Sequence, residues 1–311
     1  MNVRILLKFI TLLESRCEFL GKSLRDGKGN GMKIGIYYFS STGNTEYGVK
    51  VLKRHLELSG HQCETISIEK SAGVKPDNFE LLGFASPVFH GYPAQIMMDF
   101  IKKIPVSEKQ RPGFTILCPC FKLLSMGYWG SRENFRELIE SKNIKVLAQL
   151  GFYGEASHPY VRKLFLNRFT SLLFAASFAK NRPDKRDEKV LQRFAGELNA
   201  VCGNQRVNRT YKPHDSGLRK WLSEKMVKPL VSHLNRSLLT KVIDEKRCTR
   251  CGYCVEACPV HAISMEKQPT FDIEKCFHCQ KCTNLCPQNA IVYQDTKVFN
   301  RYKGRQSTVG M

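Results

Sequence analysis

The sequence has no uninterrupted run of apolar residues long enough to cross a bilayer. The nearest candidate, residues 164–179, is shorter than the roughly 18 residues that a membrane helix needs, and it contains Asn167 and Arg168. The N-terminal apolar stretch includes Lys8 and lacks the small-residue cleavage site of a secretory leader. These absences predict a protein with no membrane span.

Acidic residues are scarce, with 28 Asp and Glu against 49 Lys and Arg and a net charge of +21. So basic a balance raises the question of nucleic-acid binding. The excess is local, because residues 157–247 hold 20 basic and eight acidic side chains, whereas residues 248–294 hold four of each. No helix-turn-helix, zinc-finger or RNA-binding aromatic signature is present. We therefore expect no nucleic-acid partner, and the charge would suit an acidic electron-transfer partner.

The cysteines do not have the distribution of a disulfide scaffold. Eight of the 13 lie between Cys248 and Cys286, and the total is odd. This pattern indicates metal or redox ligation in a reducing compartment. Cys118 and Cys120 form a separate C-P-C at the end of a predicted buried strand. We expect these two to be small buried hydrophobes rather than a redox pair.

Two copies of C-x2-C-x2-C-x3-C-P, followed by an Ala-Ile pair, begin 28 residues apart. Structural zinc sites use paired CxxC knuckles and have no use for a third cysteine at this spacing. In two-cluster ferredoxins the fourth cysteine of each motif ligates the other cluster. The motifs therefore predict two 4Fe–4S clusters, one held by Cys248, Cys251, Cys254 and Cys286, and one by Cys276, Cys279, Cys282 and Cys258.

Strands and helices alternate in the first half of the chain. The predicted strands cover residues 33–39, 64–69, 81–87, 114–119 and 145–154, and the helices cover 46–60, 94–103 and 131–143. Such alternation predicts a doubly wound parallel sheet with helices on both faces.

The first strand-to-helix turn is rich in hydrogen-bond donors. It comprises Ser40, Ser41, Thr42, Gly43, Asn44 and Thr45. Backbone N–H groups at a helix N-terminus favour a phosphate, and a glycine lets the backbone approach it closely. The turn lacks a lysine, which disfavours a nucleoside triphosphate loop. It is suited to a phosphate monoester held by hydrogen bonds.

The segment YYFSSTGNTEYGV resembles the FMN phosphate loop of the flavodoxin family. That resemblance implies FMN as a cofactor and two further loops, residues 86–94 and 118–130, around its ring. The positions implied for ring contacts are Pro87, Phe89, His90, Gly91, Tyr92 and Trp129. The alternative is that Phe89 and Trp129 are partly exposed aromatic side chains without a ligand.

The whole layout resembles a flavodoxin–ferredoxin fusion. The implied fold is an α/β flavodoxin-like doubly wound parallel sheet, followed by a helical linker and a small α+β two-cluster ferredoxin domain. The expected divisions are an extension at 1–31, the FMN domain at 32–156, a basic linker at 157–243, the cluster domain at 244–295 and a basic tail at 296–311. Because Met32 precedes a clean strand, we expect translation to start there, the alternative for 1–31 being an amphipathic anchor.

The basic linker is predicted to contain two helices, over 182–201 and 217–239, with a kink at Pro229. The leucine and methionine stripe of the second most simply packs against one of the modules. Trp221 and its neighbouring lysines also fit peripheral contact with a membrane surface.

The resemblance implies a cytoplasmic electron-transfer protein that passes electrons between two 4Fe–4S clusters and a bound FMN. The sequence has no GxGxxG turn for a nicotinamide cofactor, so electrons would be exchanged with redox partner proteins. Two alternatives stay open: a flavin-dependent reductase of a small substrate fed by the clusters, and a ferredoxin with a vacant flavodoxin-like docking domain. Whether the protein is an enzyme is therefore left open.

Overall fold

The computed structural model describes residues 31–71, 76–89, 92–120, 126–155, 181–202, 225 and 240–293. The expected N-terminal extension, the helix over 217–239 with Pro229 and Trp221, and the basic tail lie outside the described residues, Lys225 excepted. None of the described helices is long and apolar enough to cross a membrane.

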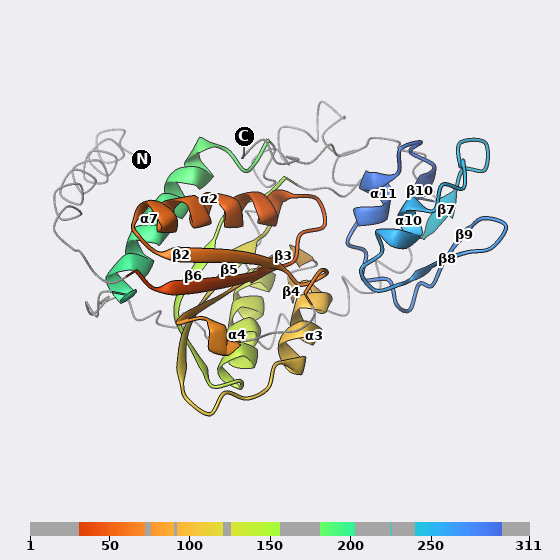
Figure 1. Cartoon of the computed structure of the whole chain (residues 1–311). Coiled ribbons are helices and arrows are strands. Elements are labelled where there is room, and N and C mark those ends of the chain that lie inside the picture. The colour runs from red at the N-terminus through yellow and green to blue at the C-terminus, as the bar shows by residue number, and fades with distance from the viewer. Residues whose placement is uncertain are drawn as a thin grey trace.

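A parallel sheet forms the centre of the first module (Figure 1). Its strands, in spatial order, are β2 (Gln62–Ser67), β1 (Lys33–Tyr38), β3 (Leu81–Phe89), β5 (Arg111–Cys118) and β6 (Ile144–Gly151). A short strand β4 (Tyr92–Pro93) pairs antiparallel with the end of β3. This is the flavodoxin-like 2-1-3-4-5 order, whose ligands bind at the carboxyl ends of the strands where the order reverses. The predicted fold class is confirmed.

Helices cover both faces of the sheet. Figure 1 shows α2 (Asn44–Leu58) and α7 (Lys185–Cys202) on one face, and α3 (Gln95–Lys103) and α4 (Met126–Glu140) on the other. A 3-10 turn, η1 (Pro76–Asn78), precedes β3. Because both faces are buried, the central strands β1 and β3 are buried at nearly every position rather than at alternate ones.

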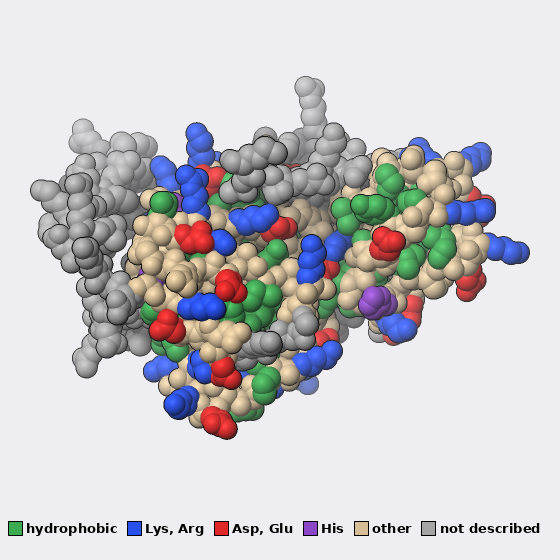
Figure 2. Space-filling model, viewed as in Figure 1, with side chains coloured by type: hydrophobic (Ala, Val, Ile, Leu, Met, Phe, Trp, Pro, Cys, Tyr) green, Lys and Arg blue, Asp and Glu red, His purple; other side chains and the backbone are tan. Residues whose placement is uncertain are grey.

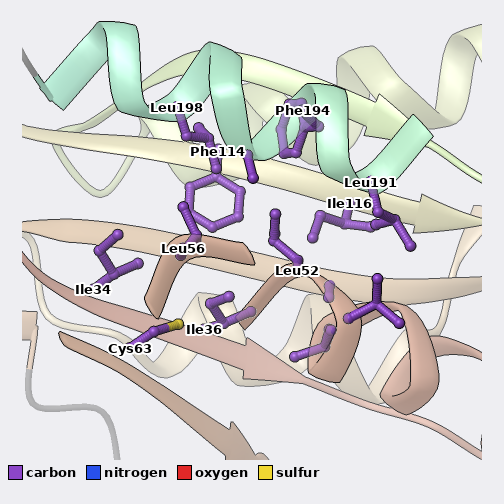
Figure 3. Close-up of a cluster of buried hydrophobic side chains, with 14 of the residues drawn as sticks. Ile34, Ile36, Leu52, Leu56, Cys63, Phe114, Ile116, Leu191, Phe194 and Leu198 are labelled. Atoms are coloured by element: carbon purple, nitrogen blue, oxygen red, sulfur yellow. The ribbon is translucent and has the colours of Figure 1, made fainter. Parts of the chain in front are cut away.

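Helix α7, from the predicted linker, is part of the core of this module. Its side chains Leu191, Phe194 and Leu198 are buried in the same cluster as Leu52 of α2 and Phe114 of β5 (Figure 3). The Phe114 and Phe194 rings meet edge to face with centroids 5.9 Å apart. Residues 185–202 therefore complete one helical layer of the sheet.

Helix α4 differs from its prediction. It begins at Met126, five residues before the expected start at residue 131. Trp129, which was expected in a ring loop, is thus part of a helix. The resemblance to flavodoxins placed residues 118–130 in a loop, but the helix includes Gly127 and Gly130. Each glycine costs a helix only about 1 kcal/mol, and packing of α4 against the sheet outweighs this.

The C-terminal module is a small α+β unit with internal symmetry. Strand β7 (Lys241–Ile243) pairs with β10 (Ile291–Tyr293), and β8 (Ile263–Met265) pairs with β9 (Pro269–Phe271). The short helices are α10 (Tyr253–Glu256) and α11 (Lys281–Leu285). The two halves of the module repeat at an interval of 28 residues, which is the spacing of the cysteine motifs. This interval separates the starts of β7 and β9, of α10 and α11, and of β8 and β10. The motif repeat is thus a structural repeat.

Candidate functional site

The eight clustered cysteines line two separate cavities in the C-terminal module. The first cavity is lined by Cys248, Cys251, Cys254 and Cys286, and the second by Cys258, Cys276, Cys279 and Cys282. The structure therefore brings together the two sets of four that the motifs predict, with the fourth cysteine of each motif crossing to the other set. Within the described ranges, no three His, Cys, Asp or Glu side chains are arranged to hold a single metal ion.

Each cysteine loop turns through left-handed backbone conformations. In the first motif Arg250 and Gly252 have φ of 58° and 76°, and in the second the equivalent His278 and Gln280 have φ of 56° and 66°. These reversals between successive cysteines allow a short loop to direct three thiols toward one cavity. The left-handed residues thus explain how cysteines that are three residues apart can face the same cavity.

Two backbone N–H groups donate to cysteine sulfurs at equivalent places. The N–H of Ala262 lies 3.2 Å from Cys258 Sγ, and the N–H of Ala290 lies 3.2 Å from Cys286 Sγ. Hydrogen bonds to ligand sulfur stabilise its negative charge and tune the potential of a cluster. The alanine of the Ala-Ile pair, to which the sequence alone assigns no role, supplies this donor in both halves.

A buried lysine that sequence analysis missed projects toward the second set of cysteines. Lys241 Nζ lies 3.5 Å from Cys276 Sγ and 3.6 Å from Cys282 Sγ, and the residue is 8% exposed. Its ammonium also lies 6.0 Å from the centroid of the Phe271 ring. Burying an unpaired ammonium costs several kcal/mol, so this group needs an anionic partner. Iron-bound thiolates meet that need, and the donor set of the second cavity fits a thiolate-ligated cluster.

The pKa shifts around this cavity agree with that fit. Burial lowers the pKa of Lys241, but Cys282, Tyr293 and Cys276 raise it more, so the pKa lies above its ordinary value. Burial raises the pKa of Cys279 to about 12, and it raises that of Cys254 in the first cavity to about 11. These thiols hold their protons without a metal, and iron binding would release them.

The predicted phosphate loop lies at the carboxyl end of β1, next to the place where the strand order reverses. Gly43 caps α2 in a left-handed conformation with φ of 87° and supplies no side-chain hydrogen bond. Ser40 Oγ accepts a 3.3 Å hydrogen bond from the N–H of Glu46 in the first turn. Ser41 and Thr45 are buried. The first N–H groups of a helix have no partner within it, so this end offers donors to an anion.

Asn44 has a further role that the sequence does not reveal. Its side-chain Nδ2 donates a 3.1 Å hydrogen bond to the backbone oxygen of Glu155, beyond the end of β6. This hydrogen bond therefore connects the predicted phosphate loop to the segment that follows β6. The backbone N–H groups and the side-chain hydroxyl groups of residues 40–45 are the donors that this loop would offer to a phosphate.

The structure describes the expected ring contacts in part. Pro87 and Phe89 are among the last three residues of β3, and Phe89 faces Tyr92 across the antiparallel pair with β4. The backbone N–H of Ala94 donates to Ser86 Oγ at 2.9 Å and closes this turn. His90 and Gly91 lie outside the described residues, and only the backbone of Trp129 is described.

The second cysteine loop packs against this edge of the sheet. The ring of Phe277 lies 5.9 Å from that of Phe39 and 6.0 Å from that of Phe89, centroid to centroid. Cys279 belongs to the same buried cluster as Phe39, and Lys281 of α11 forms an ion pair with Glu69. Figure 1 shows the C-terminal module beside the ends of β3 and β4. The second cavity is thus the inner one and the first is the outer one.

Cys118 and Cys120 do not have the character of a redox pair. Burial raises the pKa of Cys120 to about 11 and raises that of Cys118 further. Both are free thiols, and a protonated thiol is a weak nucleophile. The structure favours the interpretation of Cys118 as a small buried hydrophobe, whereas Cys120 is partly exposed.

Residues 247–299 match the family model of the 4Fe-4S dicluster domain. No curated protein matches the chain.

Solved structures match the first module. One is a short-chain flavodoxin associated with a non-canonical PDU bacterial microcompartment, with a TM-score of 0.39 and 12% identity over 55% of this chain and 99% of that chain. Another is oxidised Flavodoxin 1 from Bacillus cereus, with a TM-score of 0.39 and 13% identity over 54% and 97% of the two chains. A third is rubredoxin oxygen:oxidoreductase from Desulfovibrio gigas, with a TM-score of 0.39 and 13% identity over 56% and 36%.

Proposed function

We propose that this chain, which joins a flavodoxin-like sheet to a 4Fe–4S domain and so has an electron-transfer role, carries electrons between two clusters and one FMN. The outer cluster would be held by Cys248, Cys251, Cys254 and Cys286, and the inner one by Cys258, Cys276, Cys279 and Cys282. FMN would bind with its phosphate at residues 40–45. The clusters exchange single electrons, whereas a flavin can hold one or two.

The contact of Phe277 with Phe39 and Phe89 is the observation that carries this proposal. Phe39 directly precedes the phosphate loop, and Phe89, the last residue of β3, lies within the first expected ring loop. Phe277 lies between two cysteines of the inner cavity. One aromatic side chain therefore connects the inner cavity to the two aromatic residues beside the expected flavin site.

The outer cavity supports exchange with a partner protein. Cys251 is exposed, as are Lys246 and Arg250 beside it. Figure 2 shows both basic and acidic side chains along the outer end of this module. An exposed redox centre is accessible to a partner protein, and charged side chains of both signs around it can orient that partner at low salt. We therefore propose that the redox partner docks at the outer cavity.

Replacing Phe277 by alanine tests the inner contact. The loss of two aromatic contacts, each worth about 0.5–1.5 kcal/mol, would lower the docking equilibrium constant of the two modules roughly tenfold. We expect iron and FMN contents to stay at their parental values while the rate of FMN reduction falls. Anaerobic rapid mixing with a one-electron reductant, followed at the flavin and cluster absorbance bands, measures that rate.

Ile273→Ala is the matched control, because Ile273 is an apolar residue of the same module that is 47% exposed. It should leave the rate unchanged. If Phe277→Ala also leaves the rate unchanged with both cofactors bound, electrons do not pass through this contact.

A further inference from the structure

We propose that Lys241 is a positioning residue that raises the reduction potential of the inner cluster by holding a fixed positive charge against two of its ligand sulfurs. This inference rests on the proposed function, since it requires a cluster in the inner cavity. It concerns a residue outside the cysteine motifs, at the first position of β7.

The geometry places this charge where the electron would reside. Lys241 Nζ is within 3.6 Å of both Cys276 Sγ and Cys282 Sγ, and the side chain is buried beside the ring of Phe271. Reduction adds one negative charge to a cluster, and net charge and hydrogen bonds to sulfur set its potential. A cation that is shielded from water and bonded to the sulfurs therefore favours the reduced form.

The internal repeat shows that this charge is specific to one half of the module. The position 28 residues after Lys241 is Pro269, which begins β9 and lines the outer cavity. Proline has neither a charge nor a side-chain donor. By contrast, the backbone bonds from Ala262 and Ala290 to sulfur occur in both halves at the same distance. Arg250 also lines the outer cavity, but it is exposed and its charge is screened by water.

The two cavities also differ in exposure to solvent, and the charge of Lys241 offsets the effect of that difference on the reduction potentials. Burial disfavours the more negative, reduced state of a cluster, because less water is present to stabilise the added charge. The inner cavity adjoins the buried core of the sheet, whereas the outer cavity reaches the surface at Cys251. Without a compensating cation the inner cluster would be the poorer electron acceptor. By raising the reduction potential of the inner cluster, Lys241 would let this cluster accept electrons from the outer one at its position beside the flavin site.

The test is a redox titration of the full-length protein monitored by electron paramagnetic resonance. The Cys251→Ala background removes an outer ligand, so the inner cluster is observed alone. In that background, Lys241→Met should lower the reduction equilibrium constant of the inner cluster at least tenfold, a shift of ~59 mV for one electron. Lys275→Met is the matched control: Lys275 directly precedes Cys276, but its side chain is 65% exposed, so the potential should stay in place.

A Lys241→Met potential equal to that of Lys275→Met, with four irons retained, would overturn the inference. Should Lys241→Met lose its iron, Pro269→Lys decides the matter in a Cys279→Ala background, where the outer cluster is observed alone. A higher outer potential in that variant supports the role of a buried cation at this position, and an unshifted potential contradicts it. Absence of iron from the unmodified protein would instead refute the proposed function.

Discussion

Replacing Cys279 by alanine will remove the inner cluster and separate the FMN from the outer one, whereas replacing Cys251 will remove the outer cluster and leave the inner one beside Phe277 and the predicted flavin site. The two cysteines occupy equivalent positions 28 residues apart, so each variant loses one ligand of one cavity. We expect about four irons per chain in each variant against about eight in the parent. FMN content should be unchanged in both.

The two variants should nevertheless differ in electron transfer, because only the inner cavity adjoins the sheet through Phe277. In Cys251→Ala, reduction of the remaining cluster should be followed by reduction of the flavin at close to the parental rate. In Cys279→Ala, the flavin should be reduced at least tenfold more slowly after the remaining cluster is reduced. Freeze-quenched samples, with cluster and flavin signals recorded together, measure both steps. Equal rates in the two variants would show that the order of the cofactors is wrong.

Ser41→Asp will abolish FMN binding while the clusters remain. Ser41 is a buried residue in the predicted phosphate loop, so a carboxylate there would lie next to the phosphate. Two unit charges about 4 Å apart interact by roughly 4 kcal/mol at an effective dielectric of 20, and the phosphate carries more than one charge. We therefore expect at least a hundredfold loss of FMN affinity, measured by flavin fluorescence during titration of the flavin-free protein.

Ser41→Asn is the matched control, since asparagine has nearly the shape of aspartate but no charge. It should bind FMN far more tightly than Ser41→Asp does. Iron content and circular dichroism should match the parent in both variants, which separates loss of the flavin from loss of the fold. Parental FMN affinity in Ser41→Asp would show that residues 40–45 do not hold the phosphate.

The cysteine spacing predicts more of the site than any other feature of the sequence. Each motif is a local loop, so the spacing groups its first three cysteines, whereas the grouping of Cys258 with the second motif and of Cys286 with the first came from the pattern of two-cluster ferredoxins. The two cavities have these linings. The strands were also predictable, with ends that differ by a few residues, because runs such as that of β1 are apolar on both faces.

Features that depend on contacts between distant segments could not be predicted in this way. Helix α7 has an ordinary amphipathic pattern, and only the fold shows that α2 and the sheet receive its apolar face. Lys241 is a single lysine in a short apolar strand, and nothing near it in sequence marks it as a neighbour of Cys276 and Cys282. Phe277 is an unremarked residue between two cysteines until its contacts with Phe39 and Phe89 are known.

Counting the electrons that the full-length protein takes up in an anaerobic reductive titration tests the central claim most directly. Two 4Fe–4S clusters should accept about two electrons, and one FMN should accept about two more. The account predicts about four electrons per chain, with the flavin band bleaching together with the cluster bands. An uptake of about two electrons, without bleaching of a flavin band, would contradict it and favour a ferredoxin with a vacant flavodoxin-like docking domain.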